Sequence, residues 1–307
     1  MPAVNRREWE IIIIGGGPAG LTAAIYGGRA GHAVLVLEKM QSGGKIVSTD
    51  WVDNYPGFPE GIGGIEYGQA LEQQALKFGA EVLYAVFEKS DLEGESKRIG
   101  SSAGEFAAPK VIVATGTEPR SLGIPGEKEL QGHGVSHCST CDGAFFSGKE
   151  VAVVGGGDAA VDESLYLTRF ARKVYLIHRS DRLHAVRSLQ DRVLADRRIE
   201  ILWNTEVQAI EGSWKAAGLK LIRGKTSQYL PIDGVFISIG RKANTELFAE
   251  LRKDEDGFII TDEEMRTSCG GVFAAGDIRS KSLRQVITAA ADGAVAAYTA
   301  GKELQKI

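Results

Sequence analysis

Short apolar runs alternate with glycine-rich turns and alanine-rich stretches along the chain. Residues 10–14 form a β-branched apolar run, which predicts a buried strand, and residues 15–20 follow as a glycine turn. Residues 21–29 are rich in alanine and favour a helix. A second apolar run at residues 33–37 ends in Glu38. The pattern therefore predicts a strand–helix–strand unit with parallel strands.

The same order of elements returns in the middle of the chain. An apolar run at residues 151–154 is followed by a glycine turn at residues 155–160, a helix-like stretch through Phe170 and a strand at residues 173–177. The first glycine of this turn lies 140 residues after the first glycine of the earlier turn. Two such units predict an α/β protein with two Rossmann-like dinucleotide-binding domains, each in three layers. The repetition is far more specific than one glycine loop alone.

The remaining apolar runs indicate that the first domain is discontinuous. Residues 111–116, 234–240 and 271–277 each predict a buried strand that ends in a glycine turn, and residues 286–304 predict an alanine-rich final helix. Residues 119–125 lie between two prolines and predict a connector. The predicted domains have these boundaries: residues 1–117 together with 245–307 for the first, and residues 118–244 for the second.

Composition and charge exclude several classes of function. The 307 residues are 43% hydrophobic and 25% charged, which is typical of a soluble globular protein. The net charge of -4 gives no electrostatic basis for binding nucleic acid. The apolar run Ile11–Ile14 ahead of the first glycine turn is too short for a signal sequence or a membrane span, so no membrane is expected. Three cysteines do not make a disulfide framework, which favours a reducing compartment, the cytoplasm.

The first glycine turn has the chemistry of a dinucleotide site. Its glycines allow the backbone to approach a pyrophosphate, and the following helix offers free N–H groups and a favourable dipole. Glu38 lies 18 residues after Gly20, where an acid can accept hydrogen bonds from a ribose diol. The alternative interpretation is a solvated acid at a strand end. An acid here would repel a 2′-phosphate, so the site suits FAD or NAD.

The second glycine turn is followed by cations at the equivalent place. His178 and Arg179 begin 18 residues after Ala160, and Arg182 follows shortly. Arginine at such a strand end can bind a phosphate or stack on adenine, although a solvated turn is the alternative. The two domains are therefore predicted to bind different nucleotides.

Cys138 and Cys141 form a C-x-x-C pair at the start of the second domain. This spacing allows a reducible disulfide and can lower the pKa of one thiol. The alternative is half of a zinc site with His133 and His137, but no second C-x-x-C exists, so no metal is predicted. Cys269 stands alone and is expected to be a small buried hydrophobic residue.

These features together resemble a known family. The motifs that carry the resemblance are Gly15-Gly-Gly-Pro-Ala-Gly20, Gly43-Gly44, Asn54-Tyr-Pro-Gly-Phe58, Ala114-Thr-Gly116, Cys138-Ser-Thr-Cys-Asp142, Gly155-Gly-Gly-Asp158 and Gly271-Val-Phe-Ala-Ala-Gly-Asp277. In this order they are similar to the signatures of bacterial, low-molecular-weight thioredoxin reductases. The similarity runs nearly end to end. The cysteine pair within the second domain separates this family from glutathione-reductase-like enzymes, whose cysteines lie in the FAD domain.

The resemblance implies two cofactors and a set of residues for each. FAD would lie in the first domain against Gly15, Gly17, Ala19, Gly20, Glu38, Gly44, Lys45, Asn54, Thr115, Gly116, Gly276, Asp277, Arg284, Gln285 and Val286. NADH or NADPH would lie in the second domain against Gly155, Gly157, Asp158, His178, Arg179, Arg182 and Gly240.

The resemblance also implies a catalytic route. Cys138 and Cys141 would be the redox-active disulfide, with Cys141 facing the flavin and Asp142 donating and accepting the proton. Electrons would pass from the nicotinamide through FAD and this disulfide to a thioredoxin-like protein. In the family the nucleotide domain rotates on two linkers, here residues 116–120 and 242–245, and the enzyme is a homodimer.

Departures from the family pattern leave the nicotinamide cofactor open. Relatives that use NADPH have H-R-R-x-x-x-R where this chain has Ser180 and His184 in place of two arginines. Lys45 replaces a glutamine and Ala243 replaces a proline, for which we have no physical account.

Two alternative functions remain at the level of sequence. A flavoenzyme of the same fold could use ferredoxin or a small dithiol as its partner. A non-enzymatic nucleotide sensor would bind cofactor without turnover, but it would have no need of the C-x-x-C-D motif.

Overall fold

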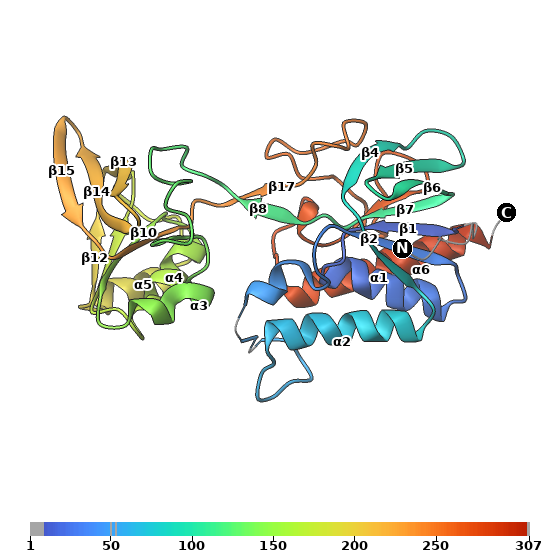
Figure 1. Ribbon diagram of the computed structural model, residues 1–307, viewed down its shortest axis with the longest axis horizontal. Helices are drawn as coiled ribbons and strands as arrows, with labels where there is room; N and C mark the ends of the chain where they lie inside the picture. The colour runs from blue at the N-terminus through green and yellow to red at the C-terminus, as the bar shows by residue number, and fades with distance from the viewer. Residues whose placement is uncertain (1–8, 50, 53, 306–307) are drawn as a thin grey trace. The chain divides into compact units, whose positions relative to one another are not determined.

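The computed structural model describes residues 9–49, 51–52 and 54–305 of the chain. The chain forms two compact units, one of residues 1–118 with 242–307 and one of residues 119–241. It leaves the first unit in β8 (Thr117–Pro119) and returns in β17 (Arg241–Ala243), and these two strands pair with each other (Figure 1).

The first unit is built on a five-stranded parallel sheet in the order β18-β7-β1-β2-β3. Its strands are β1 (Ile11–Ile14), β2 (Val34–Glu38), β3 (Glu81–Tyr84), β7 (Lys110–Val113) and β18 (Val272–Ala274). In the register of the sheet, Ile11 of β1 lies between Val34 and Lys110. β1 is buried on both faces, which accounts for its unbroken β-branched sequence.

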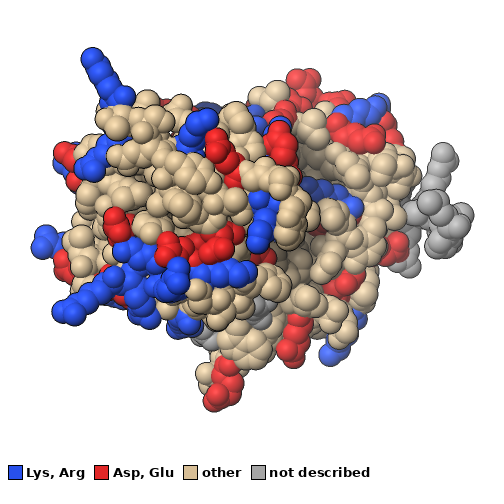
Figure 2. All heavy atoms as spheres, turned by 60° about the vertical axis from the view of Figure 1, so that its left-hand side comes forward, with Lys and Arg blue, Asp and Glu red and all other residues tan. Residues whose placement is uncertain are grey.

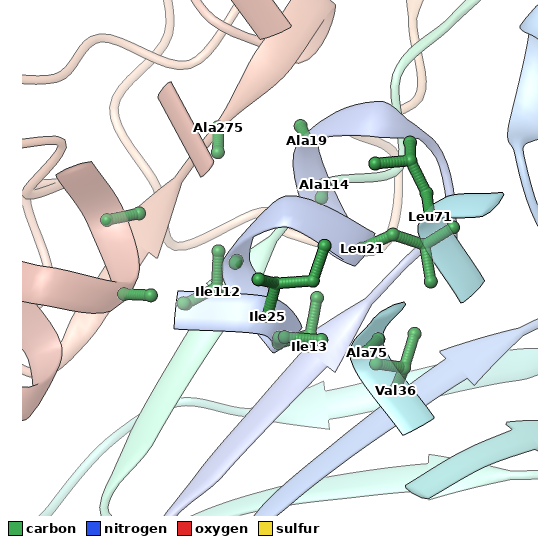
Figure 3. Packing of buried hydrophobic residues seen from close by; sticks show 14 of the residues in the cluster. Ile13, Ala19, Leu21, Ile25, Val36, Leu71, Ala75, Ile112, Ala114 and Ala275 are labelled. Atoms are coloured by element: carbon green, nitrogen blue, oxygen red, sulfur yellow. The ribbon is translucent and has the colours of Figure 1, made fainter. Parts of the chain in front are cut away.

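Three helices cover one face of this sheet: α1 (Pro18–Arg29), α2 (Gly64–Lys77) and α6 (Val286–Leu304), all below it in Figure 1. Figure 3 shows Ile13 and Ile112 of the sheet in the same cluster as Leu21 and Ile25 of α1. Gly293 lets α6 approach α1 closely, because a Cβ there would lie 2.0 Å from the Ala19 carbonyl oxygen.

The other face of the sheet carries a three-stranded antiparallel sheet of β4 (Phe87–Asp91), β5 (Lys97–Ser101) and β6 (Gly104–Ala108). Ile12 and Ile14 of β1 pack there with Ile99, whereas Ile11 and Ile13 pack under the helices. This alternation follows from the two-residue period of a strand. The first unit therefore has three layers.

The second unit repeats this architecture. Its parallel sheet has the order β12-β11-β10-β16-β9, with these bounds: β9 (Val135–Ser136), β10 (Glu150–Val154), β11 (Lys173–Ile177), β12 (Ile199–Leu202) and β16 (Gly234–Ile237). Val151 and Val153 pack in one cluster with α4, and Ala152 and Val154 pack in another with the antiparallel strands. The other elements are α3 (Ser139–Asp142), α4 (Asp158–Leu167), α5 (Arg187–Ala195), β13 (Thr205–Gly212), β14 (Ala216–Arg223) and β15 (Thr226–Pro231).

Two predicted boundaries were wrong. The first helix begins at Pro18 rather than at residue 21. Pro18 comes directly after the N-cap Gly17, and a proline at the first helical position fixes φ at a helical value. The helix after the second glycine turn ends at Leu167, and Thr168–Phe170 form a turn instead of continuing it. Short 3-10 helices complete the fold: η1 (Gly44–Ser48), η2 (Gly143–Phe146) and η3 (Gly276–Ile278).

Candidate active site

The first glycine turn is shaped for close backbone approach. Gly15 has φ of +106°, and a Cβ at Gly20 would lie 1.9 Å from the Gly15 carbonyl oxygen. Gly17, in contrast, has no heavy atom closer than 3.9 Å to its hypothetical Cβ, and its position as N-cap of α1 brings no side-chain hydrogen bond. The turn therefore leaves space and an uncapped helix N-terminus for a pyrophosphate.

Glu38 at the end of β2 is buried and held from both sides. The Gly16 N–H donates to its Oε2 at 2.7 Å, and the Met40 N–H donates to its Oε1 at 3.0 Å. Each oxygen retains a lone pair that can accept a ribose hydroxyl. A fixed, buried carboxylate beside the glycine turn does not match the alternative of a solvated strand-end acid.

Four of the predicted flavin-side residues form two hydrogen-bonded pairs, one of which joins distant parts of the chain. Asn54 Nδ2 donates to Gln285 Oε1 at 3.2 Å across 231 positions. Gln285 is the N-cap of α6 and forms a capping box with Thr288. Arg284 Nε donates to the Asp277 carbonyl oxygen at 3.4 Å. Amide and guanidinium groups thus gather at the start of α6.

The strand end at residues 114–116 is tied to the returning chain by Asn244. Asn244 Nδ2 donates to the Thr115 carbonyl and Thr115 Oγ1 donates to the Asn244 carbonyl, both at 2.9 Å. Lys45 Nζ donates to Thr117 Oγ1 at 3.3 Å, so the lysine that departs from the family pattern has a partner within the unit. The sequence did not mark Asn244 or Thr117 as site residues, because nothing in it showed that the two segments meet.

This donor set fits FAD. It offers an uncapped helix N-terminus for phosphates, an acid for the ribose and polar side chains for the edge of a ring. Gly276 also lies against this turn, since a Cβ there would be 2.8 Å from the Ala19 Cβ. A side chain at Gly276 would therefore press on the start of α1.

The second glycine turn has the same construction. A Cβ at Gly155 would lie 2.2 Å from the Ser238 carbonyl oxygen, while Gly157 has open space around it and caps α4 without a side-chain bond. Asp158 Oδ1 accepts the Val186 N–H at 2.7 Å. Asp158 thus fastens the loop after β11 to the start of α4.

The structure gives His178 a position beneath the turn rather than at its surface. The imidazole is buried, and its Nε2 lies 2.9 Å from the Arg182 carbonyl oxygen. A Cβ at Gly156 would lie 2.2 Å from the ring. Burial lowers the pKa of His178, although the backbone of Arg182 acts in the opposite direction. Arg179 and Arg182 are exposed, so both cationic side chains can reach a nucleotide.

Cys138 is disulfide-bonded and lies directly before α3. Its N–H donates to Ser136 Oγ at 3.0 Å, and the Asp142 N–H donates to its carbonyl at 3.2 Å. Cys269 is a free thiol whose Sγ bonds to a backbone carbonyl, and burial raises its pKa. The side chain of Cys141 lies outside the described part of the structure.

A groove of about 390 Å³ adjoins the cysteine motif. Asp142, Phe145 and Trp214 line it, and the two aromatic side chains are strongly exposed. Figure 2 shows that positive and negative side chains lie side by side on the face that it draws. Trp214 was missed at the level of sequence, because a single aromatic residue between β13 and β14 carries no motif.

Among the described residues, no group of three or more His, Cys, Asp or Glu side chains could hold a metal ion. None of the helices described has both the length and the apolarity needed to cross a membrane.

Comparison with known proteins gives the family. The sequence profile described as pyridine nucleotide-disulphide oxidoreductase matches residues 9–293. The chain belongs to this family. Pyridine nucleotide-disulphide oxidoreductases named thioredoxin reductase are among its relatives: one from Listeria monocytogenes is 44% identical and one from Bacillus subtilis is 46% identical. The alignments cover 99% and 96% of this chain and 97% and 94% of those proteins, respectively.

Solved structures of this family agree with the fold. The Lactococcus lactis thioredoxin reductase gives a TM-score of 0.88 at 38% identity and covers 98% of this chain and 100% of its own. The T. acidophilum thioredoxin reductase gives a TM-score of 0.85 at 30% identity and covers 98% of this chain and 100% of its own. The predicted α/β fold with two dinucleotide-binding domains and the predicted family are confirmed.

The enzyme class follows from the family: the chain is an FAD-dependent oxidoreductase that uses a pyridine nucleotide. A ferredoxin-flavin thioredoxin reductase from Clostridium acetobutylicum is also similar, at 31% identity and a TM-score of 0.54. Its lower TM-score makes the ferredoxin alternative the weaker of the two interpretations.

Proposed function

We propose that this enzyme is a thioredoxin reductase. In the balanced reaction, NADH or NADPH and one proton reduce the disulfide of a thioredoxin-like protein to two thiols, leaving the oxidised nicotinamide. The disulfide at Cys138, within the second of two units that each carry a glycine turn in their sequence, supports this proposal most directly. The thioredoxin reductases from Listeria and Bacillus, similar over nearly their whole length, add to it.

The first unit contains the proposed FAD-binding domain, residues 1–117 with 245–307. Gly15, Gly17 and Gly20 allow the pyrophosphate to approach α1, and Glu38 accepts the ribose hydroxyls. When bound, FAD supplies a ring that takes a hydride from the nicotinamide and gives an electron pair to a disulfide. The residues proposed to bind along it are Ala19, Gly44, Lys45, Asn54, Thr115, Gly116, Gly276, Asp277, Arg284, Gln285 and Val286.

The proposed nicotinamide-nucleotide domain, residues 118–244, contains the whole of the second unit. Gly155, Gly157 and Gly240 provide close backbone approach, while Arg179 and Arg182 meet the ribose end of the nucleotide. His178 and Asp158 act indirectly in this proposal, because both hold the loop after β11 against the glycine turn.

The cysteine pair Cys138 and Cys141 is the proposed relay. Its disulfide accepts two electrons and becomes a dithiol, with Asp142 as the group that supplies and later removes a proton. One thiolate then attacks the disulfide of the thioredoxin-like protein, a mixed disulfide forms, and the second thiol resolves it. This exchange regenerates the Cys138–Cys141 disulfide.

A homodimer in the cytoplasm completes the proposal. The homodimer rests on the family resemblance, and the cytoplasm rests on a cysteine content that does not suit a disulfide-stabilised secreted protein.

An insulin-coupled assay with purified holoenzyme and several bacterial thioredoxins tests the function. We expect thioredoxin-dependent oxidation of NADH or NADPH that disappears in Cys138→Ser. Flavin reduction without turnover of any thioredoxin would contradict the proposal. Turnover with ferredoxin in place of thioredoxin would contradict it as well.

A further inference from the structure

Asp292 in the middle of α6 is a buried carboxylate with three partners. Its Oδ1 accepts from Arg279 Nη1 at 2.7 Å, and its Oδ2 accepts from Lys281 Nζ at 2.8 Å and from the Gly276 N–H at 3.0 Å. The side chain of Asp292 is 10% exposed, and those of Arg279 and Lys281 are each 12% exposed. The three charged groups are therefore largely removed from water.

Stability alone does not explain such a cluster. Burying ions costs hydration energy that their attraction only partly returns, and well-packed apolar residues can often replace a buried ion pair without loss. A buried, fully hydrogen-bonded carboxylate does fix its partners in one geometry, since any rearrangement leaves a charge unpaired. The role of Asp292 therefore depends on which groups it holds in one geometry.

All three partners of Asp292 lie in residues 276–281, the segment that leads from β18 toward α6. This segment carries Asp277. The segment also contacts Arg284, because the Arg279 carbonyl accepts a hydrogen bond from Arg284 Nη2 at 3.2 Å.

The start of α6 is linked to the same cluster. Lys281 Nζ also donates to Thr288 Oγ1 at 3.4 Å. Thr288 is the residue that closes the capping box on Gln285, which in turn bonds to Asn54. One carboxylate thus connects to all three proposed flavin-side residues between 277 and 285: to Asp277 through its neighbour Gly276, to Arg284 through Arg279, and to Gln285 through Lys281 and Thr288.

We propose that Asp292 is a positioning residue for the flavin: it holds Asp277, Arg284 and Gln285 in place before FAD binds. The proposal rests on the FAD site proposed above. Preorganised contacts bind more tightly because the protein does not have to order them on binding. Asp292 itself reaches the cofactor only through these residues.

Asp292→Asn tests the proposal, because it keeps the volume of the side chain and removes its charge. The amide can accept from one donor but leaves Arg279 and Lys281 without an anion. We expect the Kd of the apoenzyme for FAD to rise at least tenfold, and the visible circular dichroism of bound FAD to change shape, because the contact groups are no longer held in place and must be ordered when FAD binds.

Glu303→Gln is a matched control on the same helix. Glu303 also pairs with one lysine and one arginine, Lys110 at 2.7 Å and Arg266 at 2.8 Å, and it lies 11 residues further along α6. This variant should lower the melting temperature of the protein without changing its FAD affinity or the dichroism of its flavin.

The outcomes separate the inference from the proposed function. If Asp292→Asn and Glu303→Gln lose the same stability and both retain wild-type FAD affinity and flavin dichroism, Asp292 is structural only and the inference is wrong. If the wild-type protein itself binds no FAD, the proposed site is wrong. Should Asp292→Asn not fold, Lys281→Met leaves the Arg279 pair intact, and unchanged FAD affinity in that variant would equally overturn the inference.

Discussion

We expect the loop after β11 to determine whether the enzyme prefers NADH or NADPH. Its exposed polar residues are Arg179, Asp181, Arg182 and His184. Ser180 and His184 occupy the two positions that are arginine in the pattern of NADPH-using relatives. Replacing both by arginine, Ser180→Arg with His184→Arg, should therefore increase the preference for NADPH.

The expected size of the change follows from the bonds that a 2′-phosphate can form. A charge-assisted hydrogen bond is worth about 1.5 kcal/mol or more, so two additional arginine contacts give about 3 kcal/mol, on the order of a hundredfold. The backbone of the loop is already fixed, because the Ser180 carbonyl accepts the Asn204 N–H at 3.2 Å and the His184 N–H donates to the Gly156 carbonyl at 2.8 Å. The substitutions thus change side chains without having to rebuild the loop. Asp181 remains and opposes the phosphate.

The assay is kcat/KM for NADPH and for NADH at fixed, low ionic strength, because an exposed phosphate site is screened by salt. Wild type should favour NADPH weakly or prefer NADH, and the double variant should shift the ratio toward NADPH about a hundredfold. Ser188→Arg, an exposed serine at the start of α5, is the control that adds charge outside the loop. A wild-type preference for NADPH of a hundredfold, or an equal shift in the control, would refute the reasoning.

Three further changes test other parts of the account. Gly20→Ala places a methyl group 1.9 Å from the Gly15 carbonyl oxygen, which distorts the glycine turn, so the purified protein should contain little FAD. The control Gly270→Ala, whose methyl group meets no atom within 4 Å, should retain FAD. Burial raises the pKa of Glu163 from 4.5 to about 7, so its contribution to the free energy of unfolding is fully present below pH 4.5 and is lost as pH rises through 7. Denaturant titrations across this range should show a loss of up to about 3 kcal/mol in wild type that is absent in Glu163→Gln; equal pH dependence in both would exclude Glu163 as its source. Asp142→Asn should slow exchange with thioredoxin while FAD stays bound, and wild-type rates at every pH would remove the proton-transfer role.

Sequence patterns predicted the parallel core of both units well, because those strands have an unmistakable physical signature. Ile11–Ile14 and Val151–Val154 are apolar runs followed by glycines, as expected for strands buried on both faces that end at a nucleotide. The antiparallel sheets were not predicted. β4, with the sequence Phe-Glu-Lys-Ser-Asp, is mostly exposed and carries no apolar pattern, and β15 is similar.

The candidate site likewise contains residues that the sequence predicts and residues that it does not. Glu38 could be found by its spacing from Gly20, since the spacing reflects the length of a strand–helix–strand unit. Asp292 could not, because a lone acid in an alanine-rich helix has the same sequence pattern whether it faces water or a buried arginine. The inward position of His178 was equally hidden, since only the fold shows that Gly156 lies against its ring.

The central claim is that electrons leave the flavin only through the cysteine pair. The most direct test is stopped-flow reduction of holoenzyme by NADH or NADPH, with and without thioredoxin, in wild type and in Cys141→Ser. The account predicts that flavin reduction by the nicotinamide remains near the wild-type rate in Cys141→Ser, while thioredoxin no longer reoxidises the flavin. Full thioredoxin turnover in Cys141→Ser would contradict it.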